Sequence, residues 1–156
     1  MWRPIHREGF SCPSGTGRQP AVGLRPSLKP AEEQIRLGGM PNEAWNWPEA
    51  LDALSAAPQY HLLLLENERV RMLDSRVPQG HTVPLHTHRW PSALYILSWS
   101  GFVRRDGEGR IVVDSREIGK TTGNTALWSG PLPPHTLENV GESDLRTISV
   151  ELKNSR

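Results

Sequence analysis

The strongest constraint on the fold is a run of short apolar segments, separated by turn signals, from Tyr60 to Leu152. Each segment has the length of a β-strand, and Gly, Pro, Asn or Asp residues separate it from the next. The expected strands lie in YHLLLLENERVRMLDSRVPQG, TVPLHTH, SALYILSWSGFVRRDGEGRIVVDSR, NTALWSG, PHTLENVG and DLRTISVELK. Short strands at close spacing, with no helix after them, predict a single antiparallel β-sandwich or β-barrel over residues 59–156.

One short helix is expected before the strands, within residues 41–58. The sequence WPEALDALSAAP begins at Trp47, and Asn46 stands where an N-cap is needed. Leu51 and Leu54 would give the helix one apolar face, and Pro58 would end it.

Residues 1–40 have a different composition, rich in Pro, Gly and Arg and poor in aliphatic residues. Such a segment buries too little apolar surface to offset the entropy of ordering, so we expect a disordered arm. An alternative starts from Met40, where sequence typical of a folded domain begins. If Met40 is the initiator, the preceding residues are an over-extended gene prediction.

Composition excludes several classes of function. The chain of 156 residues carries 18 Lys and Arg against 17 Asp and Glu, a balance that argues against a nucleic-acid or anionic-membrane partner. We find no apolar run of membrane-spanning length and no secretory signal, so a cytoplasmic protein is expected. Cys12 is the single cysteine, which excludes an intrachain disulfide and a thiolate metal cluster.

The segment TVPLHTH holds the first candidate functional residues. His86 and His88 are two residues apart on an expected strand, so both side chains face the same side. Two such imidazoles inside a barrel can bind one metal ion at about 2.0–2.1 Å. His135, on a later strand, is the candidate third ligand.

These residues carry a resemblance to the cupin superfamily, and specifically to its small single-domain members. The first cupin motif is matched by a glycine, five intervening residues and a His-X-His pair, and the second by a histidine followed after three residues by an asparagine. The matching residues are Gly80, His86, His88, His135 and Asn139, and Gly101 stands close to the place of the first motif's final glycine. The resemblance spans about Tyr60 to Leu152. It implies an antiparallel cupin barrel of the jelly-roll type that binds a divalent metal through His86, His88 and His135.

The chain departs from the cupin pattern at the glutamate of the first motif. Ser92 or Ala93 stands where that glutamate is expected, and neither is a strong ligand. Cupins related to thiol dioxygenases bind metal through three histidines without a glutamate, so a site for Fe, Zn, Ni or Mn is still implied. The alternative is a decayed site whose histidines are satisfied by hydrogen bonds. Glu138 is the nearest carboxylate to His135, although strand alternation places it on the opposite face.

Other side chains are candidates for a ligand pocket. Trp90 and Trp128 each lie close to a motif and could line the pocket together with Glu138. Arg89 and Arg104 could anchor a carboxylate by a bidentate pair, although solvent-facing positions on strands are the preferred explanation of both.

The two remaining histidines near the strands fit no motif. His81 is expected at the surface or behind the ligands, and His61 has no partner in the motif pattern. Neither is therefore expected to be a ligand.

The sequence thus predicts a small metal-binding cupin, with a dioxygenase-like or other small-molecule metalloenzyme as its function. Two alternatives stay open: a metal-free barrel that binds a small molecule, and a barrel that serves mainly for dimerisation. The resemblance also implies a homodimer, because cupins often pair through edge strands.

Overall fold

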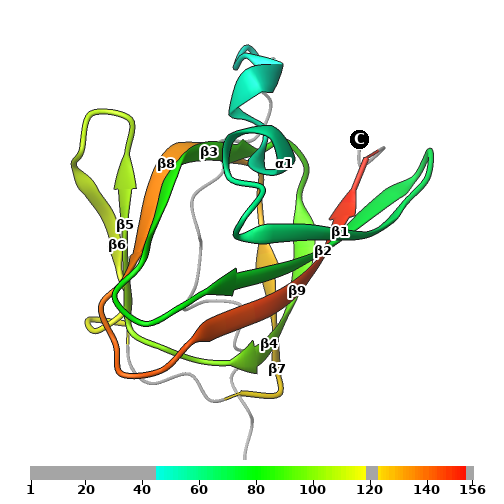
Figure 1. Cartoon of the computed structure of the whole chain (residues 1–156). Coiled ribbons are helices and arrows are strands. Elements are labelled where there is room, and N and C mark those ends of the chain that lie inside the picture. The colour runs from blue at the N-terminus through cyan, green and yellow to red at the C-terminus, as the bar shows by residue number, and fades with distance from the viewer. Residues whose placement is uncertain (1–44, 119–122, 154–156) are drawn as a thin grey trace, which may run out of the picture.

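The computed structural model describes residues 45–118 and 123–153. Nine strands follow a short helical segment (Figure 1). They are β1 (His61–Glu66), β2 (Val70–Val77), β3 (Thr82–His88), β4 (Ser92–Ser98), β5 (Phe102–Asp106), β6 (Ile111–Asp114), β7 (Thr125–Ser129), β8 (Leu132–Asn139) and β9 (Leu145–Leu152). Every expected strand segment therefore forms a strand, which confirms the predicted all-β architecture.

The strands form two antiparallel sheets that enclose the interior between them. One sheet has the order β1-β2-β9-β4-β7 and the other the order β3-β8-β5-β6. Their inward side chains form the core, in which Leu73, Val83 and Ile96 are almost completely buried. Because β3 pairs with β8, which lies far from it in the sequence, residues of both motifs meet in one interior.

The helical segment is present, but it is divided. A 3₁₀ helix spans Glu49–Leu51, and the α-helix α1 (Ala53–Ala56) follows it. The N-cap of α1 is Asp52, whose side chain accepts a hydrogen bond from the amide of Leu54 at 3.0 Å. The backbone of Asp52 is extended and forms a bridge with Thr87 of β3, which interrupts the helix at this residue. The prediction of Asn46 as the cap of one continuous helix was therefore wrong.

Two expectations concern the N-terminal segment and membrane-spanning helices. Residues 1–40, with Met40, lie outside the described residues, so the disordered arm and the alternative initiator stay predictions. Within the part of the chain that the structure describes, no helix has the length and apolar character needed to cross a membrane.

Asn139 holds the end of β8 to the loops around it. Its amide nitrogen donates to the carbonyl oxygens of Val77 and Ser143, at 2.8 Å each. Its amide oxygen accepts from the hydroxyl of Ser100 at 2.8 Å and from the backbone of Gly141 at 3.1 Å. Asn139 is 1% exposed, and its partners Val77 and Ser100 are also buried, so these two groups would lose their bonds without gaining water. The second-motif asparagine thus has a structural role.

Asn139→Ala should lower the free energy of unfolding by about 3 kcal/mol, since it leaves several buried groups without partners. Urea denaturation of both proteins measures the difference. The neighbouring Glu138→Ala is the control and should cost less than about 0.5 kcal/mol, because Glu138 faces outward. An equal effect of the two substitutions would contradict this role of Asn139.

Candidate metal centre

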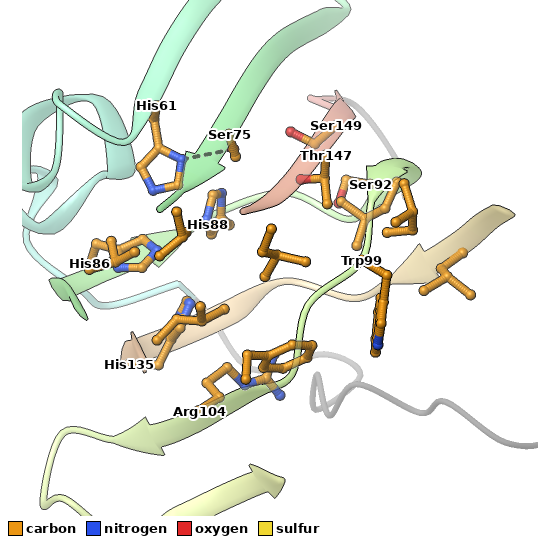
Figure 2. Close-up of a pocket in the computed structure, with 18 of the residues that line it drawn as sticks. His61, Ser75, His86, His88, Ser92, Trp99, Arg104, His135, Thr147 and Ser149 are labelled. Carbon is orange, nitrogen blue, oxygen red and sulfur yellow. Dashed lines mark hydrogen bonds between the residues drawn. The ribbon is translucent and has the colours of Figure 1, made fainter. Parts of the chain in front are cut away.

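The pairing of β3 with β8 brings the histidines of the two motifs together. His86 lies directly opposite His135 in this pairing, and their ring centroids are 4.3 Å apart. His88 follows on the same face of β3, with its ring 5.1 Å from that of His86 and 5.9 Å from that of His135. The structure thus brings the three side chains that the sequence indicates as candidate ligands next to one another (Figure 2).

A fourth histidine, His61, completes the group from the start of β1. Its ring lies 5.0 Å from that of His86 and 5.2 Å from that of His88. One nitrogen from each of His61, His86 and His88 lies within 4.8 Å of the others, a spacing that one metal ion can bridge. The expectation that His61 stands apart from the site was wrong, because the pairing of β1 with β2 carries this side chain inward toward β3.

Main-chain carbonyl groups fix the orientation of two of these rings. Nδ1 of His86 lies 2.8 Å from the carbonyl oxygen of Pro84, and Nδ1 of His135 lies 2.8 Å from that of Pro133. A carbonyl oxygen can only accept, so Nδ1 carries the proton in both rings and Nε2 keeps its lone pair. On both facing strands, the carbonyl group two residues before the histidine thus leaves Nε2 unprotonated and able to bind a metal ion.

Side chains hold the other two rings by the same nitrogen. Nδ1 of His88 lies 2.8 Å from Oε1 of Glu151, and Nδ1 of His61 lies 2.8 Å from the hydroxyl of Ser75. With Nδ1 engaged in all four histidines, Nε2 is the nitrogen available for a metal. A histidine ligand commonly donates its second N–H to a carboxylate or carbonyl oxygen, which fixes the tautomer that binds.

Glu151 is part of a buried charged network. Its side chain is fully buried, and Oε2 accepts from Nε of Arg71 at 2.6 Å. Arg71 also donates two bonds of 2.9 Å to the carboxylate of Asp52 at the start of α1. Burial alone would lower the pKa of Arg71, but its hydrogen bonds to Asp52 and Glu151 outweigh burial and raise that pKa. The guanidinium therefore stays charged and holds the Glu151 carboxylate against His88.

Burial keeps His61, His86 and His135 neutral. Removal from water, reinforced by the neighbouring histidines, lowers the pKa of His61 to about 2. Burial likewise lowers the pKa of His86 to about 3 and that of His135 well below its usual range. Nε2 of His61 is buried without any hydrogen-bond partner among the described residues. Neutral imidazoles with an unsatisfied buried nitrogen fit a metal ion well, because binding requires the unprotonated ring.

The histidines occupy one end of a cavity of about 130 Å³ between the two sheets. Its remaining wall is largely apolar, with Phe102 and Trp99 among the lining side chains. Side chains with hydroxyl groups on β2, β4 and β9 also line the cavity, and so does Arg104 of β5. An engineered apolar cavity of similar volume binds benzene, so this one has room for a small molecule.

The pocket residues expected from the sequence lie outside this cavity. Trp90 packs beneath the guanidinium of Arg71, 4.8 Å from its ring centroid, and lines a separate cleft next to Asp52. Trp128 is 55% exposed on β7, and Glu138 turns outward to an ion pair of 4.0 Å with Arg105. Strand alternation explains Glu138, since an odd spacing from the inward His135 places it on the other face.

Two further residues from the sequence analysis can be located. Ser92, one of the two residues at which the resemblance places a glutamate, is buried and lines the same cavity as the histidines. His81 is exposed, and its ring lies near the hydroxyl of Tyr60 at 3.4 Å, away from the site. The carboxylate that contacts a histidine of the site is Glu151, which accepts from His88 and which no motif spacing indicates.

Comparisons with known proteins show likeness in structure. No family model matches the sequence, and no curated protein matches it. A cupin domain from Bordetella pertussis Tohama I is similar with a TM-score of 0.49 at 18% identity, over 60% of this chain and 91% of that one. An RmlC-like cupin family protein from Methanocaldococcus jannaschii has a TM-score of 0.44 at 14% identity, over 73% and 93%. The polyketide cyclase RemF from Streptomyces resistomycificus has a TM-score of 0.42 at 20% identity, over 60% and 64%.

The described residues have the two-sheet antiparallel architecture expected of a cupin jelly roll. Two antiparallel sheets enclose one interior, and the His-X-His strand pairs with the strand of the second motif. The expected cupin jelly roll is therefore confirmed at the level of the fold.

The metal-free protein should lose stability as the pH falls below about 6.5. The folded state holds the pKa of His61, His86 and His135 below the unfolded value, so the unfolded state binds more protons in this range. Each histidine that the folded state keeps neutral then lowers the free energy of unfolding by about 1.4 kcal/mol at pH 5.5. Chemical denaturation from pH 7.5 to 5.5 measures this loss, which should be smaller in His61→Gln and unchanged in the exposed His81→Gln. A stability that stays flat over this range would contradict the prediction.

Proposed function

We propose that this protein binds one divalent metal ion through Nε2 of His61, His86, His88 and His135. The observation that supports this most directly is the orientation of the rings. Nδ1 of each histidine contacts an oxygen atom, and one nitrogen from each of His61, His86 and His88 lies within 4.8 Å of the others. His135 stands next to this group through His86, so it is the natural fourth donor.

The donor atoms favour some metals over others. Imidazole nitrogen suits Zn, Fe and Ni, whereas Mn prefers carboxylate and water oxygens. The lining of the cavity, within the described residues, contains no Asp or Glu. We therefore propose Zn, Fe or Ni as the metal and place Mn last among the four metals implied by the sequence.

The second part of the proposal is a metal-dependent enzyme that acts on a small molecule in the cavity. A bound ion supplies Lewis acidity to such a molecule or, if it is iron, redox chemistry. The chain contributes the rest: the apolar wall excludes water, and Glu151 keeps His88 in the orientation that presents Nε2. The alternative is a metal-free binding barrel, which the largely apolar cavity wall would equally serve.

Metal titration of single variants tests the site. In chelator-treated full-length protein, calorimetry with Zn²⁺, Fe²⁺ and Ni²⁺ should show tight binding of one ion per chain for at least one metal. His86→Ala should weaken the affinity at least a hundredfold, because it removes the central ligand. His61→Ala and His135→Ala should each weaken it at least tenfold.

His81→Ala, an exposed histidine away from the site, is the matched control and should bind like the wild type. Thermal melts of each variant separate lost ligands from lost folding. Absence of binding in the wild type for all three metals would overturn the metal proposal and leave the metal-free barrel. If His61→Ala bound like the control, the ligands would be only the three residues expected from the sequence.

The homodimer expected from the resemblance is kept as a proposal. Strand β1 ends the order of its sheet, and Leu62, Leu63, Leu64 and Leu65 along it are 41–62% exposed. Pairing with the β1 strand of a second copy would bury these leucines and the strand edge.

Light scattering should give a dimer mass for the wild type and a monomer mass for Leu62→Lys/Leu64→Lys. Val112→Lys, at an exposed apolar position on β6, is the control. A monomeric wild type would contradict the proposal.

A further inference from the structure

Arg104 is a buried cation that faces the cavity. It lies on β5, opposite Leu137 of β8, and belongs to the same cavity wall as His135 (Figure 2). The residue is only 6% exposed. Its place in the interior corrects the expectation of a solvent-facing arginine on a strand.

The guanidinium of Arg104 has no counter-charge in the described part of the chain. We find no hydrogen bond or ion pair from Arg104 to another described residue, and no Asp or Glu lines the cavity. Arg71, the other buried arginine, shows the usual arrangement, with bonds to two carboxylates. Burial lowers the pKa of Arg104 to about 10, so the side chain still carries its charge at neutral pH. Burial of a cation without a counter-ion lowers the free energy of unfolding, unless a bound anion compensates the charge.

The rest of the wall indicates which kind of anion would fit. Apolar residues make up much of the lining that Arg104 shares, with Phe102 two residues away on the same strand and Leu137 opposite Arg104 on β8. Such a lining favours a molecule with an apolar body and a single charged end rather than a polyanion. The cavity volume of about 130 Å³ limits that body to roughly the size of a benzene ring.

We propose that Arg104 binds the carboxylate of a small, otherwise apolar carboxylic acid in this cavity. A carboxylate matches the planar guanidinium through two parallel hydrogen bonds, which gives both charge compensation and orientation. The acid would share the cavity with the proposed metal site, but its recognition by Arg104 does not require the metal.

The test compares benzoate with benzyl alcohol, which has the same ring and no charge. Calorimetry or ligand-observed NMR on metal-free full-length protein should show benzoate binding at least tenfold more tightly than benzyl alcohol. Arg104→Gln should remove this preference by weakening benzoate at least tenfold, with benzyl alcohol unchanged. Arg105→Gln, the next residue on β5 with its partly exposed side chain, is the control and should keep the preference.

Two further measurements keep the test decisive. Arg104→Gln should melt at the same or a higher temperature than the wild type, because it removes an uncompensated buried charge. Should that variant fold poorly, Arg104→Lys keeps the charge without the planar fork and should show an intermediate preference. Equal affinities for the two probes in the wild type, or an undiminished preference in Arg104→Gln, would overturn the proposal.

The outcome is independent of the metal titration. A benzoate preference that depends on Arg104 in a protein that binds none of the three metals would support this proposal and leave only the metal proposal refuted. Tight metal binding with no benzoate preference would support the metal proposal and refute the proposal for Arg104.

Discussion

The buried carboxylate of Glu151 is the interaction on which the geometry of the site most depends. It accepts hydrogen bonds from His88 on β3 and from Arg71 on β2, while Arg71 also holds Asp52 at the start of α1. One network thus ties the histidine site to both sheets and to the helix that precedes them. A buried pair of this kind adds little net stability, but removal of either partner leaves a buried charge alone. Its value lies in fixing one ring orientation of His88.

The cavity lining, within the described residues, carries no negative charge. The charge of a divalent ion held by the histidines would be uncompensated there, and Arg104 adds a further positive charge on the same wall. The resemblance places a glutamate at Ser92 or Ala93, and neither of these residues would add a negative charge. A lining of this kind would suit an anionic ligand, as the proposal for Arg104 requires.

Local sequence patterns predicted most of the fold and half of the candidate site. Strand alternation placed His86 and His88 on one face, and the second motif indicated His135. Both signals could be found in the sequence because each motif spans only a few residues. His61 and Glu151 were missed because their roles come from the pairing of β1 with β2 and of β2 with β9, which local spacing does not encode. Arg104 was weighed as a carboxylate anchor, but only the three-dimensional packing shows that it is buried. Trp90, Trp128 and Glu138 show the converse: nearness to a motif in sequence does not place a side chain in the cavity.

X-ray absorption spectroscopy of zinc-loaded protein tests the central claim most directly, because it reports the atoms bound to the metal. Convergent histidines predict a shell of nitrogen neighbours at about 2.0–2.1 Å, with the outer-shell scattering of imidazole rings. In His86→Ala that imidazole signal should fall or the metal should be lost. A shell of oxygen neighbours without imidazole scattering in the wild type would show that the ion is held elsewhere and would contradict the account.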